Sequence, residues 1–272
     1  MLKLYKCFSS LVVLVILNAP AIQTAQIQSG IDPEALIERI LAVNEKQRSE
    51  IKDVVFDAEY IEGKKESDGS FKEEKRFVKK VYIKYLPDTT WLHEEYLEYY
   101  KDGKLQEPKK RDEEAANRLE KKKKRKTGDI SYPILRPFYP EYRDKYDLSY
   151  EGVADEKVNG YVCHHFFVTP KEKKKGLING HYYFEAESFH LVRVDFSPAK
   201  LTKKLMFRLN QLNMSILYAP TPDGFWLPKQ FDIEGKGKAA FLFGVKFAGT
   251  EYYRNPRINS GIKAEIFEVN DD

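Results

Sequence analysis

The chain has 272 residues, of which 42% are hydrophobic and 32% are charged, and its formal net charge at pH 7 is +4. A balance this close to zero argues against a nucleic-acid-binding protein, because such domains carry a strong basic excess. The length is sufficient for one large domain with a sizeable core.

The first 25 residues have the layout of a secretory signal peptide. Lys3 and Lys6 precede an apolar run from Leu11 to Leu17, and the small residues Ala19, Ala21 and Ala25 follow. This run is too short to span a bilayer, which takes about 20 apolar residues. We therefore expect export to the periplasm, with cleavage after Ala21 or Ala25. Cys7 would leave with the signal, so the remaining Cys163 could not close an internal disulfide.

An amphipathic helix is predicted next. Asp32 is a suitable N-cap, and Pro33 suits the first helical position. Leu36, Ile37, Ile40 and Leu41 then recur at helical spacing. We expect a helix to about Glu50 whose apolar face packs on another element.

From Val54 onward the sequence has the alternation and turn residues of extended strands. The expected strands are 54–60, 71–86, 91–100, 146–153, 161–169, 181–185, 191–196, 203–218, 225–234 and 239–253. Successive strands with short turns predict a sequential antiparallel meander.

A charged segment at about 104–129 interrupts the strands. We expect a solvated insertion with weak helical character that takes no part in the core. Blocks of like charge are usually solvated loops, but a basic block can also dock on anionic lipid head groups. The candidate docking residues are Lys121, Lys122, Lys123, Lys124, Arg125 and Lys126.

Several late strands carry apolar residues on both predicted faces. In 205–217, one face has Leu209 and Leu217, and the other has Leu212, Met214 and Ile216. A sheet with one solvated face would alternate cleanly between apolar and polar residues. The pattern therefore predicts that both faces are covered, one by the N-terminal helix and the other by a second sheet, a partner or an apolar ligand.

Four stretches of the chain resemble the LolA/LolB-like family of periplasmic lipoprotein-binding domains. They are Asn159 to Cys163, Asn179 to Glu187, Leu191 to Val194 and Gly224 to Pro228, and the resemblance extends over 31–100 and 131–253. It implies that 26–272 form a single domain that is mainly β with an N-terminal helix. In such a domain a strongly curved antiparallel meander makes a half-open β-barrel covered by helix. The sequence departs from the family in its charged insertion and in showing no second helix over the sheet.

The resemblance also implies an apolar cavity for acyl chains. In the family, this cavity takes lipoproteins from a membrane-associated donor to an acceptor at the other membrane. From the aromatic content we select as cavity candidates Trp91, Tyr182, Phe184, Phe207, Trp226, Phe241, Phe243 and Phe247.

No motif predicts catalysis, a cofactor or a metal. Cys163, His165 and His181 could supply two or three metal ligands, but no second Cys or His pair supports them, so packed or surface residues are the preferred interpretation. His93, Glu94 and Glu95 lack the helical spacing of a metalloprotease motif.

Two functions remain open. The first is a non-catalytic periplasmic carrier that holds an acyl chain or lipoprotein. The second is a structural or regulatory envelope protein whose second apolar sheet face docks a partner protein.

Overall fold

The computed structural model describes residues 31–66, 68–86, 89–124, 134–201, 203–204, 207–239 and 243–267. The chain divides into two units, Met1–Ile31 and Asp32–Asp272, and the fold below is that of the second. The expected signal peptide, 1–25, lies outside the described residues. Within the described part, no helix combines the length and the apolarity that crossing a membrane requires.

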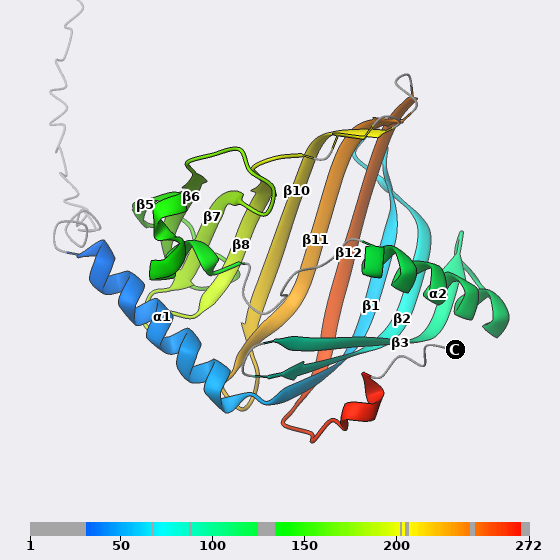
Figure 1. The fold of residues 1–272 in the computed structure, drawn as a ribbon, viewed down its shortest axis with the longest axis horizontal. Helices are drawn as coiled ribbons and strands as arrows, with labels where there is room; N and C mark the ends of the chain where they lie inside the picture. The colour runs from blue at the N-terminus through cyan, green and yellow to red at the C-terminus, as the bar shows by residue number, and fades with distance from the viewer. Residues whose placement is uncertain are drawn as a thin grey trace, which may run out of the picture. The chain divides into compact units, whose positions relative to one another are not determined.

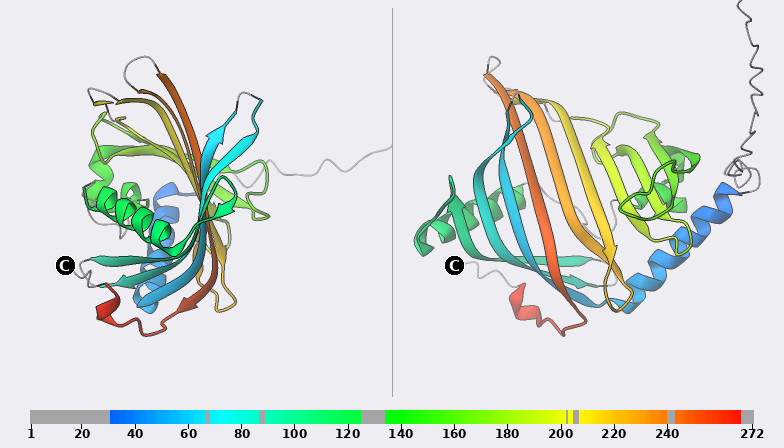
Figure 2. Two further views of the ribbon diagram at one scale, coloured as in Figure 1. Left: turned by 90° about the vertical axis from the view of Figure 1, so that its right-hand side faces the viewer. Right: turned by 180° about the vertical axis from the view of Figure 1, so that it is seen from behind.

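The described strands form one antiparallel sheet with the order β4-β3-β2-β1-β12-β11-β10-β8-β7-β6-β5, and β9 pairs with β10 (Figure 1). Their bounds are β1 Asp53–Lys65, β2 Phe71–Tyr85, β3 Thr90–Lys101, β4 Lys104–Leu105, β5 Tyr146–Val153, β6 Cys163–Pro170, β7 Ile178–Glu185, β8 Leu191–Pro198, β9 Lys203–Lys204, β10 Phe207–Pro220, β11 Trp226–Ala239 and β12 Phe243–Ile258. The sheet is curved and not closed into a barrel (Figure 2). The predicted fold class is therefore confirmed.

The strand order differs from the expected sequential meander. Strands β1 to β4 form one meander, β5 to β12 form a second, and the two join through the antiparallel pair of β1 with β12. Val54 pairs with Ile258, and Gly63 pairs with Ala248. The first and last long strands thus meet in the interior of the sheet, and an early strand and a late strand bury their side chains together.

The predicted N-terminal helix is confirmed as α1, Pro33–Glu50. The Asp32 side chain caps it by accepting a hydrogen bond from the backbone N–H of Glu34. Its buried residues Leu36, Ile37 and Ile40 recur at helical spacing, because only one face of the helix packs on the rest of the domain.

The expectation that no second helix lies over the sheet is wrong, although no residue of the insertion from 108 to 120 is buried. Pro108–Lys124 form helix α2, which lies on the same side of the sheet as α1 (Figure 2). Arg118 reaches onto the sheet, with an Nη2–Oε2 distance of 2.6 Å to Glu62 and its guanidinium 4.0 Å from the ring centre of Phe77. Lys75 pairs with Glu114 at 2.8 Å. These side chains place a highly charged helix on the sheet through ion pairs and a cation–π contact.

A β-bulge corrects the expectation that both faces of β10 are apolar. The register shifts between Leu209 and Gln211, so Leu209 pairs with Gly237 and Leu212 pairs with Gly235. Because directly paired residues share a face and Gly235 and Gly237 are two apart, both leucines lie on one face. The apparent apolarity of two faces therefore comes from counting through the bulge.

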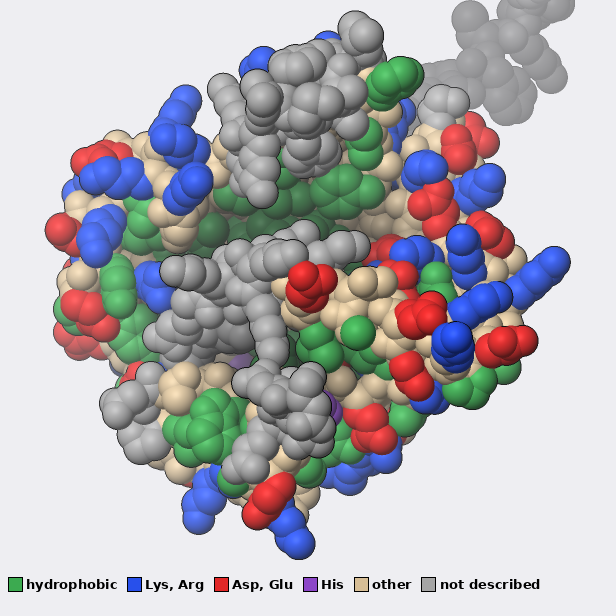
Figure 3. Space-filling view, turned by 45° about the vertical axis from the view of Figure 1, so that its right-hand side comes forward, with side chains coloured by type: hydrophobic (Ala, Val, Ile, Leu, Met, Phe, Trp, Pro, Cys, Tyr) green, Lys and Arg blue, Asp and Glu red, His purple; other side chains and the backbone are tan. Residues whose placement is uncertain are grey.

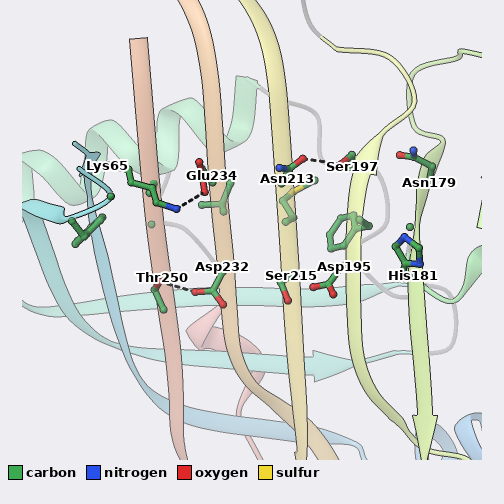
Figure 4. A pocket seen from close by; sticks show the side chains of 18 of the residues that line it. Lys65, Asn179, His181, Asp195, Ser197, Asn213, Ser215, Asp232, Glu234 and Thr250 are labelled. Carbon is green, nitrogen blue, oxygen red and sulfur yellow. Dashed lines mark hydrogen bonds and ion pairs between the residues drawn. The ribbon is translucent and has the colours of Figure 1, made fainter. Parts of the chain in front are cut away.

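The opposite, outer face carries polar residues in two rows that cross several strands (Figure 4). In one row Thr250 donates a hydrogen bond to Asp232, which pairs in register with Ser215. In the other, Ser197 lies 3.2 Å from Asn213. These rows border a groove of about 780 Å³. The polar rows give this part of the outer face the character of a solvated sheet surface.

Short 3₁₀ helices complete the described chain: η1 at Arg136–Phe138, η2 at Pro140–Lys145 and η3 at Ala264–Ile266. Phe138 of η1 is fully buried against Phe166, Tyr182 and Phe184, with ring centres 5.0 to 5.6 Å apart. This aromatic cluster anchors η1 onto strands β6 and β7.

Candidate functional site

An apolar cavity of about 530 Å³ lies between α1 and the face of the sheet that α1 covers. Its main lining residues are Ile40, Val43 and Gln47 from α1 with Ile51 directly after it, Ile83, Tyr85 and Leu92 from β2 and β3, Phe184 from β7, and Ile216, Trp226 and Phe231 from β10 and β11. Strands from both meanders therefore build one wall, and α1 builds the other.

Part of the molecular surface is a hollow lined by apolar side chains. In Figure 3, hydrophobic side chains gather in a hollow, and Lys, Arg, Asp and Glu side chains lie on the surface to either side of it. Ligand sites typically have this composition, mostly apolar with a few polar groups, and volumes of about 300–1,000 Å³. The cavity beside α1 falls in that range.

Gln47 fixes α1 against the sheet at the cavity. Its Nε2 donates to the backbone oxygen of Trp226 at 3.0 Å, and its Oε1 accepts from the backbone N–H of Trp226 at 2.7 Å. One side chain therefore satisfies both backbone groups at the first residue of β11. Asn44, one turn earlier, donates to the Tyr139 hydroxyl at 3.1 Å. The helical wall is thus held by directional bonds as well as by apolar contact.

A few polar groups line the cavity among the apolar ones. Arg48, Thr90 and His190 are among them. Burial lowers the pKa of His190, against an opposing effect of Glu185, so its imidazole is neutral at pH 7. Oγ1 of Thr90 and Nδ1 of His190 are buried and have no hydrogen-bond partner within the described part of the chain. These two atoms are available to a polar group of a ligand.

Two of the eight aromatic candidates line this cavity: Phe184 and Trp226. Tyr182 is buried next to Phe184, but its hydroxyl donates to the backbone oxygen of Ile134 at 2.8 Å, and its ring packs on Phe138. Its side chain is therefore part of the packed core.

The other aromatic candidates lie elsewhere. Trp91 packs on Phe267, with ring centres 5.5 Å apart. The ring of Phe247 lies over Gly235, where an added Cβ would come within 2.2 Å of it. Phe243, at the start of β12, is 68% exposed. Only the backbone of Phe207 is described, and Phe241 lies outside the described residues. A ligand contact for these residues stays a prediction.

The basic candidates are described only in part. Lys121, Lys122, Lys123 and Lys124 belong to the last turn of α2, and their side chains are not described. Arg125 and Lys126 lie outside the described residues. Docking by this block stays a prediction.

The residues that sequence reasoning missed are mainly on α1 and β10. The apolar spacing of Ile37 and Ile40 predicted a packed helix face, but nothing local indicated that Val43, Gln47 and Ile51 would border an open space. Similarly, Ile216 was assigned to an apolar face, but its position at the cavity depends on the bulge and on helix packing.

His165 and His181 do come together on adjacent strands, with 2.9 Å between Nε2 and Nδ1. Cys163 is fully buried and packs with Val192 and Trp226. Among the described residues there is no group of three or more side chains that could hold a metal ion. The pair by itself does not make a metal centre.

Comparisons with known proteins give likenesses at low identity. A model of a family of unknown function, DUF5686, matches residues 122–255. None of the curated proteins matches the chain.

Solved structures are also similar to the chain, among them the following three. A domain described as an outer membrane lipoprotein-sorting protein from Vibrio parahaemolyticus is 12% identical, with 85% of this chain and 97% of that chain covered and a TM-score of 0.41. A DUF1329 family protein from Desulfovibrio piger is 14% identical, with 88% and 98% covered and a TM-score of 0.43. A LolA superfamily protein from Nitrosomonas europaea is 8% identical, with 88% and 99% covered and a TM-score of 0.37.

The curved open sheet with helices on one side is the architecture that the LolA/LolB-like resemblance implies, so the structure itself confirms the fold that this resemblance predicted. Because the TM-scores of the similar structures are below 0.5, we draw no further conclusion from them.

Proposed function

We propose that this protein is a non-catalytic carrier that binds an acyl chain, free or as part of a lipoprotein, in the cavity between α1 and the sheet. The observation that carries the proposal is the cavity of about 530 Å³ with its nearly continuous apolar lining. The signal-like layout of 1–25 supports a periplasmic location, where a carrier shields acyl chains from water during transfer between membranes.

The energetics suit a carrier. Burying one methylene group contributes about 0.8 kcal/mol, so about ten buried methylenes contribute roughly 8 kcal/mol before the costs of ordering. Without those costs, a free energy of that size would correspond to a dissociation constant of about 1 μM, so the net affinity is weaker than that. Such binding is strong enough to hold a chain and weak enough to release it.

The polar outer face favours this function over docking of a partner on a second apolar sheet face. In the described parts of β8, β10, β11 and β12, that face presents Asp195, Asn213, Ser215, Asp232, Glu234 and Thr250. An extended apolar interface would need a different set of side chains there.

Leu92 and Leu97 provide a matched test of the cavity. Both lie on β3 with nearly equal exposure, 39% and 38%, but only Leu92 lines the cavity. We expect Leu92→Asp to lower the affinity for a fluorescent fatty acid at least tenfold, because an ionised carboxylate would stand in an apolar wall. Leu97→Asp should leave this affinity within about twofold. Fluorescence titration measures both.

Native mass spectrometry of the protein purified from cells, with organic extraction, identifies any natural occupant. A stoichiometric acyl adduct that is lost in Leu92→Asp supports the proposal. A protein without adduct that also takes up no fatty-acid probe contradicts it, and so does equal loss of affinity in the Leu97→Asp control.

A further inference from the structure

One end of the outer face carries a cluster of basic residues on three neighbouring strands. Arg208 of β10, Lys236 and Lys238 of β11 and Lys246 of β12 are all exposed. We call these four residues the basic end patch. Arg208 is directly opposite Lys238, and Lys236 is directly opposite Lys246. All four therefore lie on one face, within two positions of one another along the strands.

The basic end patch is electrostatically unfavourable in the isolated protein. Like charges directly opposite each other on paired strands are destabilising. In the described part of the chain none of the four residues forms an ion pair, whereas the nearby Lys65 reaches Glu234 at 3.4 Å. The two like-charged pairs therefore stand without a carboxylate partner, and an external anionic surface would relieve their repulsion.

An exposed aromatic residue lies at the same end of the sheet, on the other face. Phe243 pairs in register with Ala239, immediately after Lys238, and is 68% exposed, the highest value among the large hydrophobic side chains that the structure describes as exposed. Figures 1 and 2 show that β11 and β12 extend farther at this end than β7 and β8. Phe243 therefore stands at a projecting end of the sheet, on the face opposite the four cations, and both lie within a few residues of the same strand ends.

From this arrangement we propose that the end of the sheet formed by β10, β11 and β12 docks on an anionic phospholipid bilayer. The ends of these strands point at the bilayer, so that the four cations on one face contact lipid phosphates while the Phe243 ring on the other face enters the boundary between head groups and acyl chains. Cations at the head groups and an aromatic ring below them are the combination that interfacial membrane binding uses. An acidic protein would satisfy the cations but would offer no general reason for the exposed ring. This docking goes beyond the carrier function and does not depend on a loaded cavity.

Vesicle sedimentation tests the docking with the purified protein. The protein should bind vesicles of phosphatidylcholine mixed with phosphatidylglycerol, and much less vesicles of phosphatidylcholine alone. Added salt should weaken the binding, because exposed charges are screened. Each basic residue near an anionic surface contributes about fivefold in affinity. We therefore expect Lys236→Gln with Lys246→Gln to lower vesicle affinity about 25-fold, and Phe243→Ser to lower it about tenfold.

Stability separates this role from a structural one. Neutralising Lys236 and Lys246 removes a like-charge pair, so the melting temperature should stay equal or rise while vesicle affinity falls. The matched control neutralises Lys46 and Lys52, two exposed lysines of and next to α1, near the opposite end of the long strands. This control has the same change in net charge, and its vesicle affinity should stay within about twofold.

Three results would overturn the docking proposal: no binding to vesicles that contain phosphatidylglycerol, equal binding to vesicles without it, or an equal loss in the control. Binding to a soluble polyanion such as heparin but not to vesicles would also overturn it and would indicate a different acidic partner. Leu92→Asp should keep vesicle binding, so a failure of the carrier proposal and a failure of the docking proposal are distinguishable.

Discussion

Lys79 is a charged residue that is buried and stabilised by two carboxylates. It is 4% exposed on the helix-covered face of β2, and its Nζ lies 2.5 Å from Glu94 and 2.7 Å from Glu251. Burial by itself lowers the pKa of Lys79, but the carboxylates of Glu251 and Glu94 outweigh that effect and the net shift is upward. This pair of contacts joins β2 to β3 and to β12, so it ties the two meanders together through charge.

Removing the Lys79 ammonium should be strongly destabilising. Lys79→Met leaves two carboxylates buried without a cation, and we expect a loss of about 3–5 kcal/mol in the free energy of unfolding. Lys80→Met, on the adjacent outward-facing position, should change it by no more than about 0.5 kcal/mol. Urea denaturation at pH 7 measures both variants.

The pH dependence of this contribution has a defined sign. Because the folded-state pKa of Lys79 is raised, its stabilisation is complete below the unfolded value of about 10.4 and is lost only as pH rises through the higher folded value. A difference between Lys79→Met and the parent that vanished between pH 6 and 8 would contradict the assigned ion pairs.

At the scale of single elements, helix α1 encloses the cavity by packing over one face of the sheet. Its buried residues Leu36, Ile37 and Ile40 lie in its first half, whereas Gln47 holds the second half to β11 through two hydrogen bonds. The end of the helix that borders the cavity therefore depends more on directional bonds than the beginning does.

Gln47→Ala should loosen that end of the helix. It leaves the backbone N–H and C=O of Trp226 without these partners, which costs about 1–3 kcal/mol. We expect faster hydrogen exchange in 43–50 and at the start of β11, with exchange in 33–40 less affected. Lys46→Ala, at an exposed position on the same helix, should leave the exchange pattern unchanged. Equal acceleration along the whole helix would show that Gln47 stabilises the fold generally and does not pin one end.

The whole domain depends on contacts between segments that are distant in the sequence. Val54 and Phe56 of β1, Val81 of β2 and Leu227 of β11 belong to one buried cluster. Because β1 pairs with β12 inside the sheet, neither meander has its complete core without the other. We therefore expect the described domain to unfold as one cooperative unit.

The two tryptophans test this cooperativity, since Trp91 is on β3 in one meander and Trp226 is on β11 in the other. In Trp226→Phe the fluorescence reports the first meander, and in Trp91→Phe it reports the second. Within each variant the denaturation midpoint by fluorescence should coincide with the midpoint by far-ultraviolet circular dichroism. Separate midpoints would show that the meanders unfold independently.

Local patterns in the sequence determined the elements. The N-cap at Asp32, the spacing of Leu36, Ile37 and Ile40, and the alternation in strands such as 71–86 depend on neighbours along the chain, so helix α1 and most strand positions were predictable. The LolA/LolB-like resemblance added the curved open sheet. For α2, the density of lysine and glutamate suggested a solvated insertion, because its contacts with Glu62 and Phe77 lie far away in the sequence.

The tertiary structure alone decided the pairing of β1 with β12, the bulge at Leu209 and the cavity beside α1. A bulge changes which face each later residue occupies, so an apolar pattern on two faces can come from one buried face. A cavity is the space that side chains from α1, β2, β3, β10 and β11 leave unfilled together. No single segment encodes that space, because its volume depends on how closely separate elements pack.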